Sequence, residues 1–271
     1  MTSKILLILL LILSAKCFPQ DSLITNTTIS ENFVNDTKTV VSNFLSFYSE
    51  PLNFSSTEWL YTAGILGGTF LLISIDQEIT DNVGRKTINT LNNDFWDIPT
   101  RYGITPYATV FSLSTYATGL LIKNDDIRIT GRLLFESLTI SGVGIIVIRF
   151  LAGRVRPYYK EGEWAFRGLQ TSNEFQSFPS GHTSVAFALS TILAERIDSF
   201  WSRLGFYGMA ALTATARVIN NQHFLSDVVW GALLGFGSGM YVLHKEQISE
   251  PGKSNFSVLP YLNGISIIYS F

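Results

Sequence analysis

Residues 133–151 read LLFESLTISGVGIIVIRFL, an apolar run of helical length. A helix needs ~20 such residues to cross a bilayer, so the run is long enough for a membrane helix. Two charged residues interrupt it, Glu136 near its beginning and Arg149 near its end. An arginine at the end of such a helix is costly unless it meets an anion or reaches the interface. We therefore expect a membrane helix that ends at an anionic partner or at the headgroup layer.

Five further apolar segments have helical length. They are Trp59 to Ile75, Tyr107 to Ile122, His182 to Ala194, Leu204 to Ile219 and Val228 to Leu243. With residues 133–151 they predict an all-α fold, a helical bundle of about six core helices embedded in a membrane. Several segments are short or interrupted, so a buried helical bundle in water is the alternative.

The composition favours the membrane protein. Hydrophobic residues make up 46% of the 271 residues and charged residues 15%, against ~25% charged in ordinary soluble proteins. Mean hydropathy is +0.26. The net charge is -2 and no run of lysines or arginines occurs, so we expect no nucleic-acid partner.

The two ends of the chain differ from this helical region. Lys4 followed by the apolar run 5–15 is typical of a signal peptide, so residues 1–17 are interpreted as a signal peptide or N-terminal anchor. Residues 18–58, rich in Asn, Ser and Thr, are predicted to be a polar extension. Residues 59–247 would form the helical domain and residues 248–271 a C-terminal tail, in which apolar residues at alternate positions suggest a strand or an extended packing segment.

The stretch Pro179-Ser180-Gly181-His182 leads directly into an apolar helix. Ser180 can cap that helix, and Gly181 allows a ligand to approach the backbone closely. The first-turn N–H groups and the helix dipole then form an anion site. His182 would stand at its edge, where it can donate a proton to a leaving oxygen. Taken alone, the histidine is as compatible with a helix-capping role.

A second polar stretch, residues 217–227, reads RVINNQHFLSD. His223 and Asp227 are four residues apart and would share a helix face. The carboxylate is expected to hold one imidazole nitrogen, which leaves the lone pair of the other free for a nucleophilic or basic role. Arg217 adds a forked donor suited to phosphate oxygens. An ordinary surface pair is the alternative for His223 and Asp227.

A third stretch, residues 149–157, reads RFLAGRVRP. It brings Arg149, Arg154 and Arg156 to the end of an apolar helix, where two or three guanidinium groups are expected to converge. Arg154 can either join the site or face lipid headgroups. An arginine cluster that snorkels to the interface is the alternative.

In this order, the three stretches resemble the signature of the type 2 phosphatidic acid phosphatase superfamily, which is K-x6-R-P, P-S-G-H and S-R-x5-H-x3-D. The resemblance covers roughly residues 75–244. The chain departs from it at Arg149, where the family usually has lysine, and at Ala216, where it usually has serine. Arg149 keeps the charge but replaces a point donor by a planar fork. Ala216 removes one possible hydrogen bond.

The resemblance implies a metal-independent phosphatase without a cofactor, with its active site at one end of the bundle. His223 would attack phosphorus to form a phosphohistidine, Asp227 would orient His223, and His182 would protonate the leaving group. The residues implied to bind the phosphoryl oxygens are Arg149, Arg156, Ser180, Gly181 and Arg217. Besides His182 and His223 the chain has only His244, at the far end of the last helix, so no metal site is expected.

We expect the substrate to be a lipid phosphate or pyrophosphate, such as phosphatidate, phosphatidylglycerophosphate, a polyprenyl pyrophosphate or a lipid A phosphate. An exported soluble acid phosphatase for small phosphomonoesters is the first alternative. A vanadium-dependent haloperoxidase is a second, which the short chain disfavours. A binding protein with a degenerate site is a third, which the intact His182, His223 and Asp227 disfavour.

The sequence leaves the orientation of the protein in the membrane open. We expect an extracytoplasmic site, because lipid phosphates of this family are mostly processed there. Cleavage after residue 17 followed by three crossings would instead place Arg156 inside. Either the segment 59–75 does not cross, or residues 1–17 are no signal peptide, or the enzyme lies on the membrane.

Overall fold

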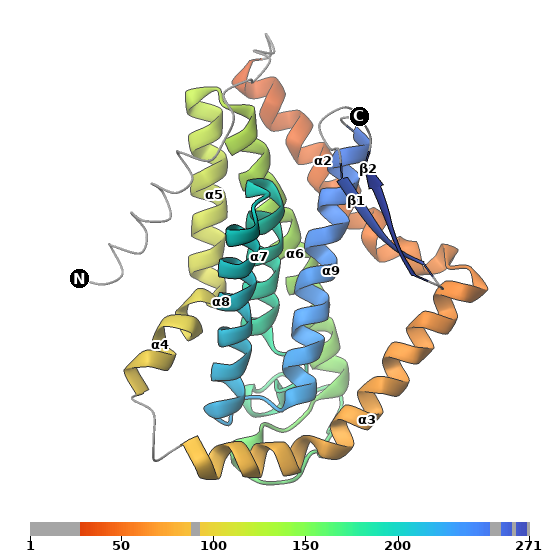
Figure 1. Ribbon diagram of the computed structural model, residues 1–271, viewed down its shortest axis with the longest axis vertical. Helices are drawn as coiled ribbons and strands as arrows, with labels where there is room; N and C mark the ends of the chain where they lie inside the picture. The colour runs from red at the N-terminus through yellow and green to blue at the C-terminus, as the bar shows by residue number, and fades with distance from the viewer. Residues whose placement is uncertain (1–27, 88–92, 250–255, 262–263, 270–271) are drawn as a thin grey trace.

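The computed structural model of the protein describes residues 28–87, 93–249, 256–261 and 264–269. Over these residues the chain forms a bundle of long helices with a small β-hairpin beside it (Figure 1). The predicted helical bundle is thereby confirmed. The predicted signal peptide or anchor, residues 1–17, lies outside the described residues.

All six apolar segments are helices. They are α3 (Ser56–Thr87), α5 (Thr105–Ile122), α6 (Asp125–Ala152), α7 (Gly181–Ile197), α8 (Phe200–Ile219) and α9 (Leu225–Ser249). Two further helices, α2 (Ile29–Ser49) and α4 (Asn93–Tyr102), come from stretches in which the sequence showed no long apolar run. Short 3-10 helices lie in the connections, at Glu50–Asn53, Pro157–Tyr159 and Asn173–Phe175.

Three of these helices are long and apolar enough to cross a membrane. The candidate spans are Ser56–Val83, Asp125–Ala152 and Leu225–Ile248. They support the predicted membrane protein.

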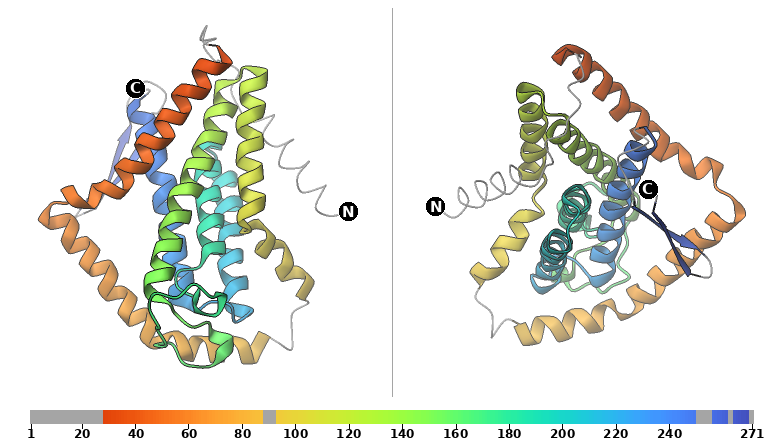
Figure 2. Two further views of the ribbon diagram at one scale, coloured as in Figure 1. Left: turned by 180° about the vertical axis from the view of Figure 1, so that it is seen from behind. Right: turned by 45° about the horizontal axis from the view of Figure 1, so that its top comes forward.

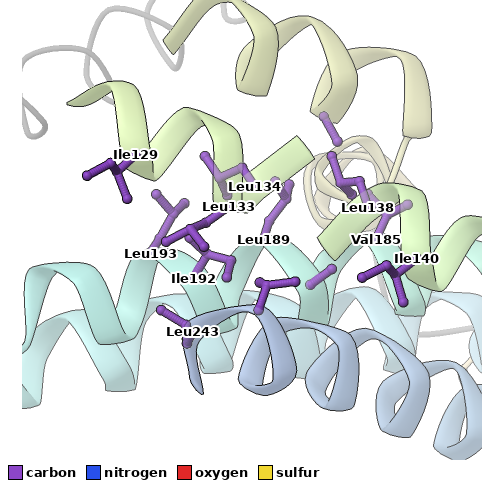
Figure 3. Close-up of a cluster of buried hydrophobic side chains, with 13 residues drawn as sticks. Ile129, Leu133, Leu134, Leu138, Ile140, Val185, Leu189, Ile192, Leu193 and Leu243 are labelled. Carbon is purple, nitrogen blue, oxygen red and sulfur yellow. The ribbon is translucent and has the colours of Figure 1, made fainter. Parts of the chain in front are cut away.

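The apolar core of the bundle lies mainly between α6, α7 and α9 (Figure 3). Leu133 and Leu134 of α6, Ile192 of α7 and Val242 of α9 are fully buried. Such interdigitated side chains hold the helices in one register, because the interior is close-packed and tolerates little sliding. The packed core therefore fixes where the ends of α6, α7 and α9 lie relative to one another.

Glycines let α9 approach α7 more closely than larger residues would allow. A Cβ added at Gly231 would lie 2.4 Å from the carbonyl oxygen of Ser180, and one at Gly235 only 2.1 Å from that of Ser184. Small residues at four-residue spacing are common where membrane helices pack tightly. This contact places the first turn of α9 beside the first turn of α7.

Residues 29–49 of the predicted polar extension form α2, which packs on α6 through polar contacts. Arg128 Nη1 donates to Asp36 Oδ2 at 2.6 Å, and the Tyr48 hydroxyl donates to the carbonyl oxygen of Ile140 at 2.6 Å. Arg132 pairs with Glu136 within α6 at 3.0 Å. The charge of Glu136 inside an apolar run is thereby compensated.

Helix α3 runs obliquely across the end of the bundle at which α6 passes into the connection to α7 (Figures 1 and 2). At the other end of the chain, the strand expected in the tail is present. Strand β1 (Phe256–Tyr261) pairs antiparallel with β2 (Gly264–Tyr269), with Phe256 opposite Tyr269.

Candidate active site

Four helix ends meet at one end of the bundle. The last turn of α6 carries Arg149, the first turn of α7 follows Ser180, the last turn of α8 carries Arg217, and the first turn of α9 carries Asp227. In the turn between α8 and α9, the backbone N–H of His223 donates to the Arg217 carbonyl oxygen at 3.3 Å. The three polar stretches of the sequence therefore come together in space.

The start of α7 has the geometry expected for an anion site. Ser180 is fully buried and caps the helix, with its Oγ accepting from the backbone N–H of Thr183 at 3.5 Å and from the Thr183 hydroxyl at 3.0 Å. The Arg149 guanidinium lies over Gly181, where an added Cβ would be 3.1 Å from Nη2. A cation and the positive end of a helix dipole thus face the same point.

Three arginines near this helix start have no anionic partner among the described residues. Arg149 Nε donates to the Pro179 carbonyl oxygen at 2.9 Å, and Arg156 Nε donates to the carbonyl oxygen of Asn173 at 2.9 Å. Arg217 is buried, and its Nε has no hydrogen-bond partner among the described residues. Within the same part of the chain none of the three forms an ion pair with a carboxylate. Buried cations of this kind require an anionic ligand.

His223 is held by a backbone carbonyl group. Its side chain is 1% exposed, and Nδ1 lies 2.7 Å from the carbonyl oxygen of Ser177. A carbonyl oxygen only accepts hydrogen bonds, so Nδ1 carries the proton and Nε2 presents its lone pair. We expected Asp227 to hold this nitrogen. Its Oδ2 instead lies 3.7 Å from Nδ1, too far for a hydrogen bond, and so the direct partner is Ser177.

Asp227 is connected to His223 through Ser177. Its Oδ2 accepts from the Ser177 hydroxyl at 2.6 Å and from the backbone N–H of Phe224 at 2.8 Å, while Oδ1 accepts from Arg154 Nη1 at 2.6 Å. The sequence left open whether Arg154 joins the phosphate site or faces headgroups. It does neither, since its side chain is fully buried against Asp227.

Burial and the surrounding cations lower the pKa of both histidines of the site and favour their neutral form. Burial lowers the pKa of His223 to about 4, with Asp227 opposing the shift and Arg149 and Arg156 adding to it. Burial and the nearby Arg217 lower the pKa of His182 to about 3. A neutral His223 suits a nucleophile. For His182, a bound anion among the same cations would raise the pKa and let the imidazole take up a proton.

The match to known families falls on this region. Residues 130–249 match the family model described as PAP2 superfamily. The chain carries a PAP2 superfamily domain. All eight residues that the sequence analysis assigned to the site lie in this PAP2 domain, between residues 149 and 227.

Curated proteins similar to this chain include two lipid A 1-phosphatases. The one from Porphyromonas gingivalis is 38% identical over 77 residues, which is 27% of this chain and 17% of that protein. The one from Rhizobium johnstonii is 30% identical over 115 residues, 42% of this chain and 46% of that protein. The chain thus spans less than half the length of these relatives.

A solved structure has the same fold. The PAP2 type phosphatidylglycerolphosphate phosphatase from Bacillus subtilis aligns with a TM-score of 0.50 at 19% identity, covering 79% of this chain and 99% of that one. At this identity the likeness concerns the helical membrane fold alone.

Sequence reasoning missed three residues that support the site. Ser177 contributes through its backbone carbonyl group, which no side-chain pattern reveals. Ser226 accepts from Arg154 Nη1 at 2.7 Å. Asp76 lies on α3, before the matched PAP2 region, and accepts from Arg154 Nη2 at 2.8 Å. The sequence did offer one signal for Asp76, which is a carboxylate directly after the apolar segment 59–75. A charge at the end of such a segment needs a partner if it is buried.

Proposed function

We propose that this protein is a lipid phosphatase that hydrolyses its substrate through a phosphohistidine on His223. The observation that carries the proposal is the set of three arginines, Arg149, Arg156 and Arg217, around the start of α7 without an anionic partner among the described residues. A phosphoryl group supplies the missing negative charge. It also has oxygens for forked guanidinium donors.

The first chemical step is the attack of His223 Nε2 on phosphorus. Its lone pair forms the P–N bond while the bond from phosphorus to the leaving oxygen breaks. His182, at the second position of α7, gives its proton to that oxygen, so that a neutral alcohol leaves. The negative charge spread over the three phosphoryl oxygens is stabilised by the arginines and by the N–H groups at the start of α7.

In the second step, water attacks the phosphohistidine. His182, now neutral, accepts a proton from the water as the new P–O bond forms and the P–N bond breaks. Inorganic phosphate leaves, and the Nε2 lone pair of His223 is restored. The hydrogen bond from Nδ1 to Ser177 keeps the imidazole oriented through both steps.

A phosphorylated lipid is the substrate class that the chain supports best. The three candidate membrane spans support a domain that lies at a lipid surface. Two curated relatives are named lipid A 1-phosphatases, and a solved structure with this fold is named a phosphatidylglycerolphosphate phosphatase. Lipid A phosphates and phosphatidylglycerophosphate are therefore the first substrates to test, at a site that we propose to be extracytoplasmic.

The test is phosphate release by purified protein from a panel of lipid and soluble phosphates in the presence of EDTA. We expect release from at least one lipid phosphate. The His223→Ala variant should abolish it, and His182→Ala should reduce it by about 10²- to 10⁴-fold, the range for losing a general acid. His244→Ala, an exposed histidine near the far end of α9, is the matched control and should keep full activity.

The intermediate is tested separately with substrate labelled in its phosphate. A phosphohistidine survives alkali and is lost in acid, and it should be absent from His223→Ala. Release only from soluble phosphomonoesters would favour the exported acid phosphatase instead. Undiminished turnover by His223→Ala would refute the mechanism.

A further inference from the structure

Arg154 uses every donor that its guanidinium group has. Nε donates to the carbonyl oxygen of Glu163 at 3.0 Å, and Nη2 donates to the same oxygen at 2.6 Å and to Asp76 Oδ2 at 2.8 Å. Nη1 donates to Ser226 Oγ at 2.7 Å and to Asp227 Oδ1 at 2.6 Å. All five N–H groups are satisfied within the protein, so none remains for a phosphate.

The surroundings of Arg154 differ in charge from those of the three arginines that we propose to bind phosphate. Its side chain is fully buried between two fully buried carboxylates, Asp227 and Asp76. The ring of Phe224 lies against the guanidinium group, with Cζ 4.2 Å from the ring centroid. Arg149, Arg156 and Arg217 have no such counterions among the described residues. Arg154 is thus neutralised by carboxylates of the protein, whereas no described carboxylate pairs with the other three.

Asp76 ties this arrangement to α3. Its Oδ1 accepts from the backbone N–H of Ser226 at 2.9 Å, and its Oδ2 accepts from the Ser226 hydroxyl. Ser226 lies in the first turn of α9, next to Asp227 in sequence. One carboxylate of α3 therefore fixes both Arg154 and the start of the helix that carries Asp227.

The contacts continue without a break from Arg154 to the imidazole. Arg154 holds Oδ1 of Asp227, and Oδ2 of the same carboxylate accepts from the Ser177 hydroxyl. The carbonyl oxygen of Ser177 accepts the Nδ1 proton of His223, and the backbone N–H of Ser177 donates to the Arg154 carbonyl oxygen at 3.1 Å. The position of the Ser177 carbonyl group thus depends on Arg154 twice.

We propose that Arg154 and Asp76 are positioning residues that lock Asp227 and Ser177, and thereby the Nδ1–H tautomer and orientation of His223. This inference rests on the proposed function, because it assigns His223 as the nucleophile. Neither residue touches the phosphoryl group. Their effect is on the fraction of molecules in which Nε2 presents its lone pair toward phosphorus.

The same contacts make α3 part of the active site, although it precedes the matched PAP2 region. Thr69 of α3 accepts a hydrogen bond from Trp230 Nε1 of α9, a second tie beside that of Asp76. The opposite face of α3 is apolar and exposed, with Phe70 and Leu71 63% and 74% exposed. Helix α3 thus offers an apolar surface to lipid and a carboxylate to the network behind His223.

Two substitutions test the proposal. Arg154→Lys keeps the charge but has a point donor that cannot reach both carboxylates as the fork does. Asp76→Asn keeps the shape and removes one negative charge. We expect kcat to fall about 10- to 100-fold in each, the range seen when the partner that orients a histidine is lost. KM should stay within about threefold, because the phosphate-binding arginines are intact.

The double variant should lose no more than the stronger single variant, since both changes break one network. Arg196→Lys is the matched control. Arg196 is a partly buried arginine in the last turn of α7, paired with Asp126 at 3.4 Å at the opposite end of the bundle. It should leave kcat unchanged.

The ¹⁵N NMR spectrum of the imidazole rings gives a readout that does not depend on turnover. The chain has only three histidines, so their signals can be resolved. Wild type should show His223 as one neutral tautomer with the proton on Nδ1, and both variants should show a mixture. If wild type turns over no phosphate, the proposed function fails, while the tautomer measurement still decides the positioning role.

Two results would overturn the inference. One is a wild-type kcat and a wild-type His223 tautomer in both variants. The other is a loss of kcat together with a lowered unfolding temperature, while the His223 signal still shows a single tautomer. That result would mean that the two residues only stabilise the fold. Should Arg154→Lys not fold, Asp76→Asn decides by the same criteria.

Discussion

Gly235→Ala is a small change that is expected to disturb the active site from a distance. The added Cβ would lie 2.1 Å from the Ser184 carbonyl oxygen and 2.9 Å from the backbone nitrogen of Ala188. Ordinary van der Waals contact begins near 3.4 Å, so α9 and α7 must separate by about 1 Å. Both close contacts are with helix backbone, which cannot rotate away as a side chain can.

The expected cost has two parts. Overpacking of this kind lowers the free energy of unfolding by about 1–3 kcal/mol. A displacement of about 1 Å between reacting groups costs about 10²-fold in rate, and the two helices carry His182 and Asp227 at the ends that meet in the site. We therefore expect a lower unfolding temperature and a kcat reduced by up to about 100-fold.

The measurements are thermal unfolding of the detergent-solubilised protein and steady-state phosphate release. Gly237→Ala is the matched control, two residues along the same helix, where an added Cβ meets nothing within 4 Å. Alanine is the better helix former by about 1 kcal/mol, so this variant should be as stable as wild type or more so. Wild-type stability and activity of Gly235→Ala would refute the close α7–α9 contact.

The remaining predictions concern pH and the arginine that departs from the family pattern. Because the pKa of His223 is lowered from 6.5 to about 4, the nucleophile stays neutral in mildly acidic solution, and the acid limb of kcat/KM should therefore lie near pH 4 rather than near 6.5. In the unfolded chain the histidines bind protons from about pH 6.5 downward, whereas folded His223 and His182 stay neutral down to about pH 4. The unfolding temperature should therefore decrease as the pH is lowered from 6.5 to 4. An unchanged unfolding temperature over that range would contradict the lowered pKa values of the two buried histidines. Arg149→Lys, which restores the lysine usual in the family, should keep kcat/KM within about tenfold, whereas Arg149→Ala should lose about 10²- to 10³-fold, as for other donors to a developing charge. Equal activities of the two Arg149 variants would place that side chain outside the phosphate site.

The helices were predictable because their signal is local. The apolar runs 133–151 and 228–243 lie within α6 and α9, and the capping serine and glycine before His182 do mark the start of α7. Helix α2 was not predicted as such, since its apolar residues alternate with Asn, Ser and Thr and form no continuous apolar run. It is held by long-range ion pairs such as that of Asp36 with Arg128.

The sequence determined which groups the site contains, because order and spacing alone indicated His182, His223, Asp227 and the arginines around them. Only the tertiary structure decided what each group touches. Arg154 and Asp76, 78 residues apart, meet inside the protein, and a backbone carbonyl of Ser177 takes the place at His223 that the i,i+4 spacing suggested for Asp227. The physical reason is that a carbonyl group carries no side-chain signature. A buried charge, in turn, is paired with whichever partner the packed helices bring within reach.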